Sequence, residues 1–136
     1  MQKDKRLKNK IKIFNFVVMN HEDLGKKGEQ IAQELYEKQG FVILDTNYRF
    51  EKNEIDIIAF NLQELVFIEV KTRSSQEWIF PEAAVNEEKQ KRIKIAAQSY
   101  LYERKMENCP CRFDVVSIVF HADGQYEVKQ FIDAFR

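Results

Sequence analysis

The chain has 136 residues, 44% of them hydrophobic and 32% charged, which is the size and balance of one globular domain with its own core. Its formal net charge is zero, which excludes the general basic excess of a strong non-specific nucleic-acid binder. No apolar run approaches the roughly 20 residues that a membrane helix needs, so we expect no membrane partner.

The N-terminal segment differs in charge from the rest of the chain. Residues 1–18 hold six Lys or Arg and one Asp, a net charge of +5, which leaves a net charge of −5 for the remainder. The apolar part of this segment is interrupted by Lys12 and Asn15, and no small-residue cleavage site follows it, so a signal peptide is not expected. We predict a basic flexible extension over residues 1–18, a single domain over residues 19–136, and a cytoplasmic protein.

The first predicted helix runs from about Leu24 to Gln39. Asp23 can cap its start, Gly40 can end it, and apolar residues recur at helical spacing, namely Leu24, Ile31, Ala32 and Leu35. Glu29 lies at the border of this apolar face. Two interpretations of Glu29 stay open: an acid that the helix dipole stabilises in the first turns, or a third acid that leans over the sheet toward a metal.

Three strands are predicted next, and the last two form a hairpin. The first covers residues 41–50 and is followed by a turn at Lys52 and Asn53. The second strand carries Asp56 between Ile55 and Ile57, and the third runs from Leu65 to Lys71 after a polar connection. Side chains alternate along a strand, so one face of the third strand is expected to carry four of its residues, Leu65, Phe67, Glu69 and Lys71.

Antiparallel pairing in this hairpin would bring Asp56 level with Glu69, beside the ammonium group of Lys71. Two carboxylates seldom lie so close without a cation, because each disfavours ionisation of the other and burial raises the cost. A Mg²⁺ ion would remove that cost, and an ammonium group beside it could orient a water or stabilise charge on a phosphate. The alternative is a salt-bridged strand end, since structural ion-pair networks also gather charges.

Residues 74–85 are predicted to form a loop, whose Trp78 and Phe80 could either stack on bases or pack in the core. Asn86 can cap a second helix, which runs from Glu87 to about Lys105. Lys89 heads the stripe of this helix that faces the sheet, in the first turn, where anions bind favourably. Its basic neighbours are expected to be mostly a solvated helix face. They are Lys91, Arg92 and Lys94.

A further strand is predicted at Arg112–Phe120, and after a turn at residues 122–125 we expect either a final strand or a short mixed segment at Tyr126–Ile132. The order of helix, three strands, helix and strand predicts an α/β fold with helices on the faces of the sheet. Cys109 and Cys111 are the only cysteines. We expect reduced thiols, because a disulfide across one residue would be strained and further zinc ligands are lacking.

Several of these segments together resemble the YraN-like family, over about residues 19 to 120. The matching residues are Gly25–Glu29, Asn47–Arg49, Glu54–Ala59, Val66–Arg73, Pro81, Ala84–Val85, Lys89, Arg92–Ile93 and Arg112–Val116. The order of Glu, Asp and Glu-x-Lys also resembles the wider PD-(D/E)xK nuclease superfamily. One departure is visible, because Ile55 precedes Asp56 where the superfamily's name has Pro.

This resemblance implies a restriction-endonuclease-like αβββαβ core, with a central mixed sheet flanked by helices, and a nuclease similar to Holliday junction resolvases. Asp56 and Glu69, with the carbonyl of Val70, would bind Mg²⁺ or Mn²⁺. Lys71 would position or activate the attacking water, and Glu29 would complete the site through a water or a second metal. Candidate contacts to nucleic-acid phosphates are Arg49, Arg73, Lys89 and Arg92.

We therefore predict a metal-dependent endonuclease that hydrolyses DNA phosphodiester bonds at branched recombination or repair intermediates, without a small-molecule cofactor. Two symmetric cuts in a junction would suit a homodimer, by analogy with the fold. The alternative is a non-catalytic module on the same fold that binds nucleic acid or a protein of DNA recombination or uptake. The acidic body favours this alternative, whereas clustered carboxylates beside a phosphate argue against it.

Overall fold

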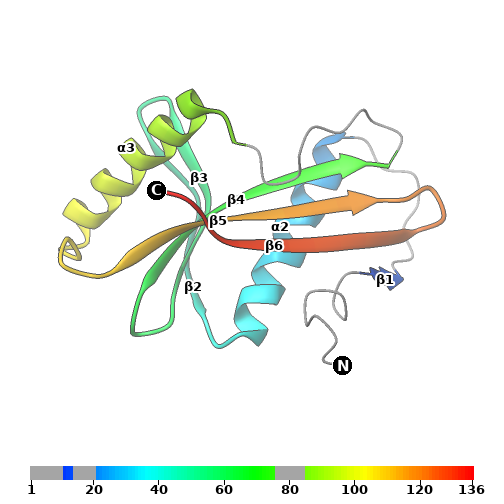
Figure 1. The fold of residues 1–136 in the computed structure, drawn as a ribbon, viewed down its shortest axis with the longest axis horizontal. Coiled ribbons are helices and arrows are strands. Elements are labelled where there is room, and N and C mark those ends of the chain that lie inside the picture. The colour runs from blue at the N-terminus through cyan, green and yellow to red at the C-terminus, as the bar shows by residue number, and fades with distance from the viewer. Residues whose placement is uncertain (1–10, 14–20, 76–84) are drawn as a thin grey trace.

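The computed structural model describes residues 11–13, 21–75 and 85–136 (Figure 1). The elements within these ranges are β1 (Ile11–Ile13), α2 (His21–Lys38), β2 (Val42–Phe50), β3 (Asn53–Phe60), β4 (Leu65–Ser74), α3 (Glu87–Glu103), β5 (Cys111–Phe120) and β6 (Gln125–Phe135). Neither helix in these ranges has the length and the apolar character that crossing a membrane requires.

The strands form one mixed sheet in the order β1-β6-β5-β4-β3-β2. β4 and β5 are parallel, and the other neighbours are antiparallel. The elements from α2 to β5 follow the order αβββαβ, so the predicted α/β fold with this core is confirmed. The parallel pair needs a crossover connection, which α3 provides.

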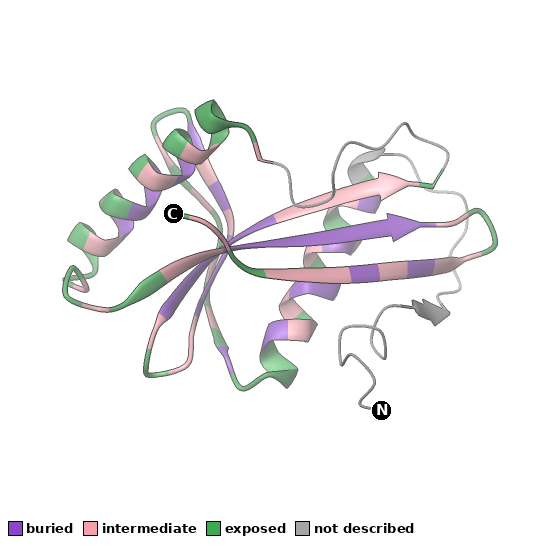
Figure 2. Ribbon diagram, in the orientation of Figure 1, coloured by how far each residue is buried: buried purple, intermediate pink, exposed green. Residues whose placement is uncertain are grey.

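The two helices cover opposite faces of the sheet, and each face has its own apolar cluster (Figures 1 and 2). Alternation along β4 divides its buried residues between them: Val66 and Ile68 pack under α2, whereas Leu65 and Phe67 pack under α3. Burial of each such side chain stabilises the fold by about 1.5–3 kcal/mol. β4 therefore contributes to both layers of the core, as does β3.

Most predicted element boundaries agree with the structure within a few residues. α2 begins three residues before Leu24, β4 continues to Ser74, and β6 continues to Phe135, three residues beyond the predicted end. Asn86 caps α3 as predicted, because its side chain accepts a hydrogen bond from the backbone N–H of Lys89 at 2.8 Å. Both cysteines, Cys109 and Cys111, are free thiols, as expected.

Two predicted segments lie largely outside the described residues. Most of the predicted loop, with Trp78 and Phe80, falls in residues 76–84. Most of the predicted extension also lies outside them, but its residues Ile11–Ile13 form β1 and pair with residues 125–127 of β6. Part of the predicted extension is thus an edge strand of the sheet.

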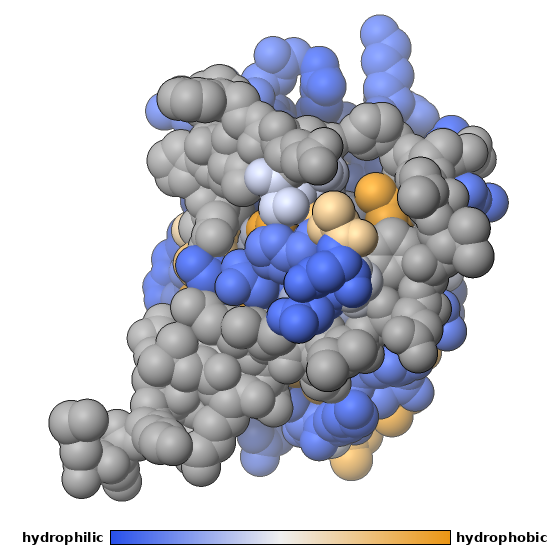
Figure 3. All heavy atoms as spheres, turned by 90° about the vertical axis from the view of Figure 1, so that its right-hand side faces the viewer, coloured by the Kyte–Doolittle hydropathy of each residue, from blue (hydrophilic) through white to orange (hydrophobic). Residues whose placement is uncertain are grey.

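The predicted turn at residues 122–125 joins β5 to β6. Gly124 has a φ of 88°, which glycine adopts without steric cost, and the Asp123 side chain accepts a hydrogen bond from the backbone N–H of Gln125 at 3.0 Å. Figure 3 faces this end of the sheet and shows hydrophilic residues gathered there. The local turn chemistry therefore explains how β6 returns beside β5.

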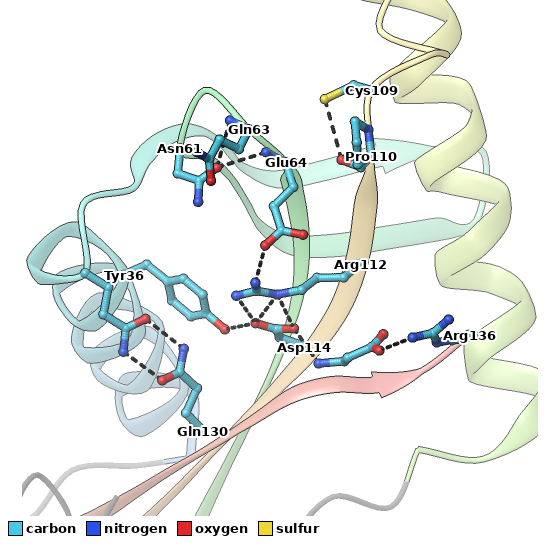
Figure 4. Close-up of polar contacts among 12 residues, drawn as sticks. Tyr36, Asn61, Gln63, Glu64, Cys109, Pro110, Arg112, Asp114, Gln130 and Arg136 are labelled. Carbon is cyan, nitrogen blue, oxygen red and sulfur yellow. Dashed lines mark hydrogen bonds and ion pairs between the residues drawn. The ribbon is translucent and has the colours of Figure 1, made fainter. Parts of the chain in front are cut away.

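A buried polar network joins α2 to the sheet (Figure 4). The carboxylate of Asp114, which is fully buried in β5, accepts a hydrogen bond from the hydroxyl of Tyr36 at 2.6 Å and from Nε of Arg112 at 3.0 Å. The backbone N–H of Asp133 in β6 donates to the same carboxylate at 2.9 Å, and Arg112 also pairs with Glu64. Burial and the charge of Asp114 raise the pKa of Tyr36, so the hydroxyl keeps its proton as a donor.

A close approach between α2 and β4 sets the position of the helix. A Cβ atom added at Gly28 would lie 2.2 Å from Oγ1 of Thr72 and 3.3 Å from its Cβ, so no other residue fits without a shift. At Gly25, one turn earlier in the same helix, an added Cβ would meet nothing within 4 Å. Gly28 therefore lets the helix backbone pack directly on β4, next to Glu29.

We expect Asp114→Asn to lower the free energy of unfolding by about 3–5 kcal/mol, because it breaks a buried ion pair and leaves Arg112 with Glu64 alone. Tyr36→Phe removes one donor to the same carboxylate and should cost less, about 1.5–3 kcal/mol. The same Asp→Asn change at Asp123, in the exposed turn, is the matched control and should cost under about 1 kcal/mol. Urea denaturation of the three variants tests this order, and a Tyr36→Phe protein as stable as the wild type would contradict it.

We expect Gly28→Ala to lower the free energy of unfolding by about 1–3 kcal/mol, because the new methyl group overlaps Thr72. Gly25→Ala should instead raise it by up to about 1 kcal/mol, since alanine is the better helix former and the space is open. Opposite signs in thermal or urea unfolding are the expected result. Stabilisation by both substitutions would show that α2 does not depend on the close approach.

Candidate active site

The candidate site lies where β3 and β4 separate. Their ladder pairs residues 57–60 with residues 65–68 and ends at the pair Ile57 and Ile68. Asp56 and Glu69 occupy the next positions, so the predicted register of the hairpin is confirmed. Beyond the ladder, Oδ2 of Asp56 accepts a hydrogen bond from the backbone N–H of Val70 at 2.8 Å. The Asp56 side chain thus accepts the backbone N–H of Val70, which would bond to a carbonyl of β3 if the ladder continued.

The two carboxylates share a poorly hydrated environment. Glu69 is 8% exposed, and burial together with the charge of Asp56 raises the pKa of Glu69 to about 7. Burial also raises the pKa of Asp56, although the hydrogen bond from Val70 acts in the opposite direction. Burial and the charge of Asp56 therefore make ionisation of Glu69 costly, whereas a hydrogen bond with Glu69 lowers the pKa of Asp56. A bound cation would relieve the cost at Glu69.

Lys89 brings a positive charge against Glu69. Its Nζ lies 3.2 Å from Oε1 of Glu69, and the Lys89 side chain is about half exposed. The first turn of α3 fixes the backbone of this lysine through the Asn86 cap, and the side chain of Gln90 donates a hydrogen bond to the carbonyl of Val85 at 2.8 Å. The predicted orientation of Lys89 toward the sheet is confirmed, and in the structure it contacts a carboxylate.

Lys71 follows Glu69 by two residues on β4 and is partly buried. Burial lowers the pKa of Lys71, and the positive charges of Arg73 and Lys89 lower it further, whereas Glu69 raises it. A lysine with a lowered pKa holds its proton less tightly than a solvated one. The structure therefore places an ammonium group with a lowered pKa on β4, close enough to Glu69 for the two charges to interact.

Glu29 lies at the edge of this acidic group. Burial raises the pKa of Glu29, and the charges of Asp56 and Glu54 add to the effect, whereas a hydrogen bond from Asn47 opposes it. Asn47 lies level with Asp56 in the β2–β3 ladder, between the pairs 46–57 and 48–55. Its φ of 51° is one that asparagine tolerates better than most residues.

Glu54 was not among the predicted site residues, although its charge acts on both Glu29 and Asp56. Its signal in the sequence is its spacing of two residues from Asp56, which directs both side chains to one face of β3. Within the described ranges, no three His, Cys, Asp or Glu side chains lie close enough to hold one metal ion. Glu29 is therefore a neighbour of the Asp56–Glu69 pair, and its participation through water stays a prediction.

The remaining predicted phosphate contacts are three arginines outside the Asp56–Glu69 pair. Arg49 is exposed and pairs with Glu54 at 3.3 Å, so it is tied to the acidic group. Arg92 pairs with Glu88 on the outer surface of α3, as expected of a solvated helix face. Arg73 lies close enough to Lys71 for its charge to lower the pKa of that lysine.

The donor chemistry of the pair fits a hard divalent cation. Asp56 and Glu69 offer carboxylate oxygens, which Mg²⁺ and Mn²⁺ prefer, and Mg²⁺ completes its coordination with water. Two protein carboxylates are enough for such an ion when a substrate phosphate supplies further oxygens. The raised pKa values show that the metal-free pair carries an electrostatic cost that a cation would remove.

Comparison with known proteins gives one consistent result. The model of the family described as "Uncharacterised protein family UPF0102" matches residues 28–118, which include Glu29, Asp56, Glu69, Lys71 and Lys89. A UPF0102 protein of Chlorobium phaeobacteroides (strain DSM 266) is 45% identical over 118 residues, covering 83% of this chain and 93% of the relative. A UPF0102 protein of Clostridium perfringens is 41% identical over 117 residues, covering 85% of this chain and 96% of the relative. One of Dictyoglomus thermophilum is 39% identical over 118 residues, covering 86% of this chain and 100% of the relative.

We expect Glu69→Gln to gain stability relative to the wild type as the pH rises, in a buffer with EDTA. The folded state binds the Glu69 proton more tightly than the unfolded state, so the wild type loses stability as the pH rises from about 4.5 through about 7. The variant cannot lose that proton. The difference in free energy of unfolding should grow by about 1–3 kcal/mol between pH 5 and pH 8.5.

Glu88→Gln is the matched control for this experiment, because it makes the same change on the exposed surface of α3. Its difference from the wild type should stay within about 0.5 kcal/mol. A gap between Glu69→Gln and the wild type that shrinks with rising pH would mean that Lys89 stabilises the charged carboxylate more than burial and Asp56 destabilise it.

Proposed function

The chain belongs to the YraN-like family UPF0102, and we propose that it is a metal-dependent endonuclease that hydrolyses phosphodiester bonds of DNA. The observation that carries this proposal is the pair of carboxylates, partly buried Asp56 and buried Glu69, at the point where two strands separate, with Lys71 and Lys89 near Glu69. A structural ion pair would not require two mutually repelling acids in a poorly hydrated place.

Each residue of the pair has a role in this proposal. Asp56 and Glu69, with the carbonyl of Val70, would hold Mg²⁺ or Mn²⁺, and the ion supplies charge stabilisation and an acidified water when it is bound. The hydrogen bond from the backbone N–H of Val70 fixes the Asp56 carboxylate in advance. The protein therefore needs little rearrangement to offer its oxygens.

Lys71 would position the attacking water and exchange a proton with it. Its lowered pKa brings the ammonium group closer to the range in which proton transfer at neutral pH is efficient. Glu29, held by Asn47, would complete the site through a water or a second metal. Attack on phosphorus would then displace the leaving oxygen in line, with Lys71 and Lys89 close to the developing negative charge.

The positive groups at the rim support a nucleic-acid substrate. Lys89 contacts Glu69, Arg49 contacts Glu54, and Arg73 lies near Lys71, so each could meet a backbone phosphate. We propose branched recombination or repair intermediates as the substrates, a homodimer for paired cuts, and a cytoplasmic site of action. These finer assignments rest on the likeness to junction-resolving nucleases and on symmetry.

We expect Mg²⁺-dependent or Mn²⁺-dependent cleavage by the wild type when it is incubated with labelled duplex, single-stranded, flap and four-way-junction DNA. Lys71→Met should lower the cleavage rate by about 100-fold or more, because it removes the group that handles the proton. Calorimetry should show that Lys71→Met still binds the metal, whereas Glu69→Ala does not. Lys52→Met, in the exposed β2–β3 turn, is the matched control and should cleave like the wild type.

The same labelled DNA substrates, run on gels, distinguish the nuclease from the alternative function. Shifted bands without cleavage, equal in the wild type, Glu69→Ala and Lys71→Met and insensitive to EDTA, would contradict the nuclease. They would favour a non-catalytic module that binds nucleic acid on the same fold.

A further inference from the structure

The ion pair between Lys89 and Glu69 joins groups of very different accessibility. The Lys89 side chain is 51% exposed, whereas that of Glu69 is 9% exposed. The charge that offsets the buried acid therefore reaches it from the solvent side, on a flexible stem of four methylene groups. Because the Asn86 cap holds the backbone of Lys89, the ammonium group can swing outward without any change in α3.

The ammonium group and a divalent cation would compete for the same carboxylate. Glu69 has three charged neighbours from three elements: Asp56 on β3, Lys71 on β4 and Lys89 on α3. One oxygen of Asp56, Oδ2, accepts the backbone N–H of Val70, so the metal would share its protein contacts between the other oxygen of Asp56 and Glu69. The Lys89 ammonium group lies 3.2 Å from Oε1 of Glu69. It therefore takes up space beside that oxygen and neutralises the negative charge that would attract the metal.

We propose that Lys89 is a stand-in cation, which neutralises Glu69 while the site holds no metal and is released to a substrate phosphate when the metal binds. This proposal rests on the proposed nuclease function and deepens it. Lys89 is then a positioning residue whose partner depends on metal occupancy. The protein would present its full phosphate-binding charge only after the metal is in place.

The consequence is an order of binding. A released Lys89 remains at the first turn of α3, where the Asn86 cap still holds its backbone and its ammonium group is free to meet a phosphate. Before the metal binds, the same lysine is engaged with Glu69, and two carboxylates repel the phosphate. Metal and DNA should therefore strengthen each other's binding, and thermodynamic linkage requires the two factors to be equal.

The first test titrates Ca²⁺ into the metal-free protein at pH 8.5 by calorimetry, without nucleic acid. Lys89→Met keeps most of the stem and removes the charge, so it should bind Ca²⁺ roughly fivefold or more tightly than the wild type. Lys91→Met, an exposed position two residues along the same helix, is the matched control and should stay within about twofold. Lys89→Arg retains a cation and should bind Ca²⁺ like the wild type.

The second test measures the affinity of each protein for a four-way-junction DNA with and without Ca²⁺, by fluorescence anisotropy. Ca²⁺ should strengthen DNA binding by a certain factor in the wild type. In Lys89→Met this factor should be at most roughly one fifth of the wild-type value. Lys91→Met should lower the DNA affinity slightly in both conditions and leave the factor unchanged. An equal factor in Lys89→Met and the wild type would overturn the release of Lys89 to phosphate.

The outcomes separate this proposal from the nuclease function. Ca²⁺ binding that is no tighter in Lys89→Met than in Lys91→Met overturns the stand-in cation, even if the wild type cleaves DNA. Tighter binding and altered coupling in Lys89→Met, together with no cleavage of any DNA by the wild type, support the stand-in cation and contradict the nuclease. Failure of all these proteins to bind Ca²⁺ overturns both.

Discussion

The buried carboxylate of Asp114 is the interaction on which the rest of the structure depends. Its donors come from α2, β5 and β6, and its partner Arg112 also reaches Glu64 at the start of β4. A carboxylate removed from water is stable only when donors surround it, so this single group fixes the relative positions of four elements. The position of α2 then determines where Glu29 lies relative to β3 and β4, because Gly28 packs on Thr72 in the same helix.

The two groups of buried acids in this protein have opposite surroundings. The Asp114 carboxylate accepts hydrogen bonds from a phenol hydroxyl, a guanidinium group and a backbone amide, so both of its oxygens have donors. Glu69 has one ammonium partner from the solvent side and a second carboxylate beside it. Stability is often given up at functional sites, so this contrast supports the proposed role of Asp56 and Glu69.

The parts of this arrangement that the sequence predicts are those that follow from local periodicity. Alternation and the short connection of the hairpin predict that Asp56 lies level with Glu69, and the helical stripe of α3 predicts that Lys89 faces the sheet. The pairing of Tyr36 with Asp114 could not be predicted, because the two residues are 78 positions apart and neither stands out from its neighbours. The partner of Lys89 is equally non-local: its identity depends on how closely α3 approaches β4, which no pattern in either segment encodes.

The parallel pairing of β4 with β5 has a consequence for the order in which the protein assembles. Partners such as Leu65 and Cys111 are 46 positions apart, whereas the β3–β4 hairpin closes through a four-residue connection. Local contacts form faster, so the hairpin can exist while Asp56 and Glu69 are still hydrated. Desolvation of these acids waits for the docking of α3 and β5. The free-energy cost of burying the two carboxylates therefore arises late in folding, when the apolar contacts of the sheet can offset it.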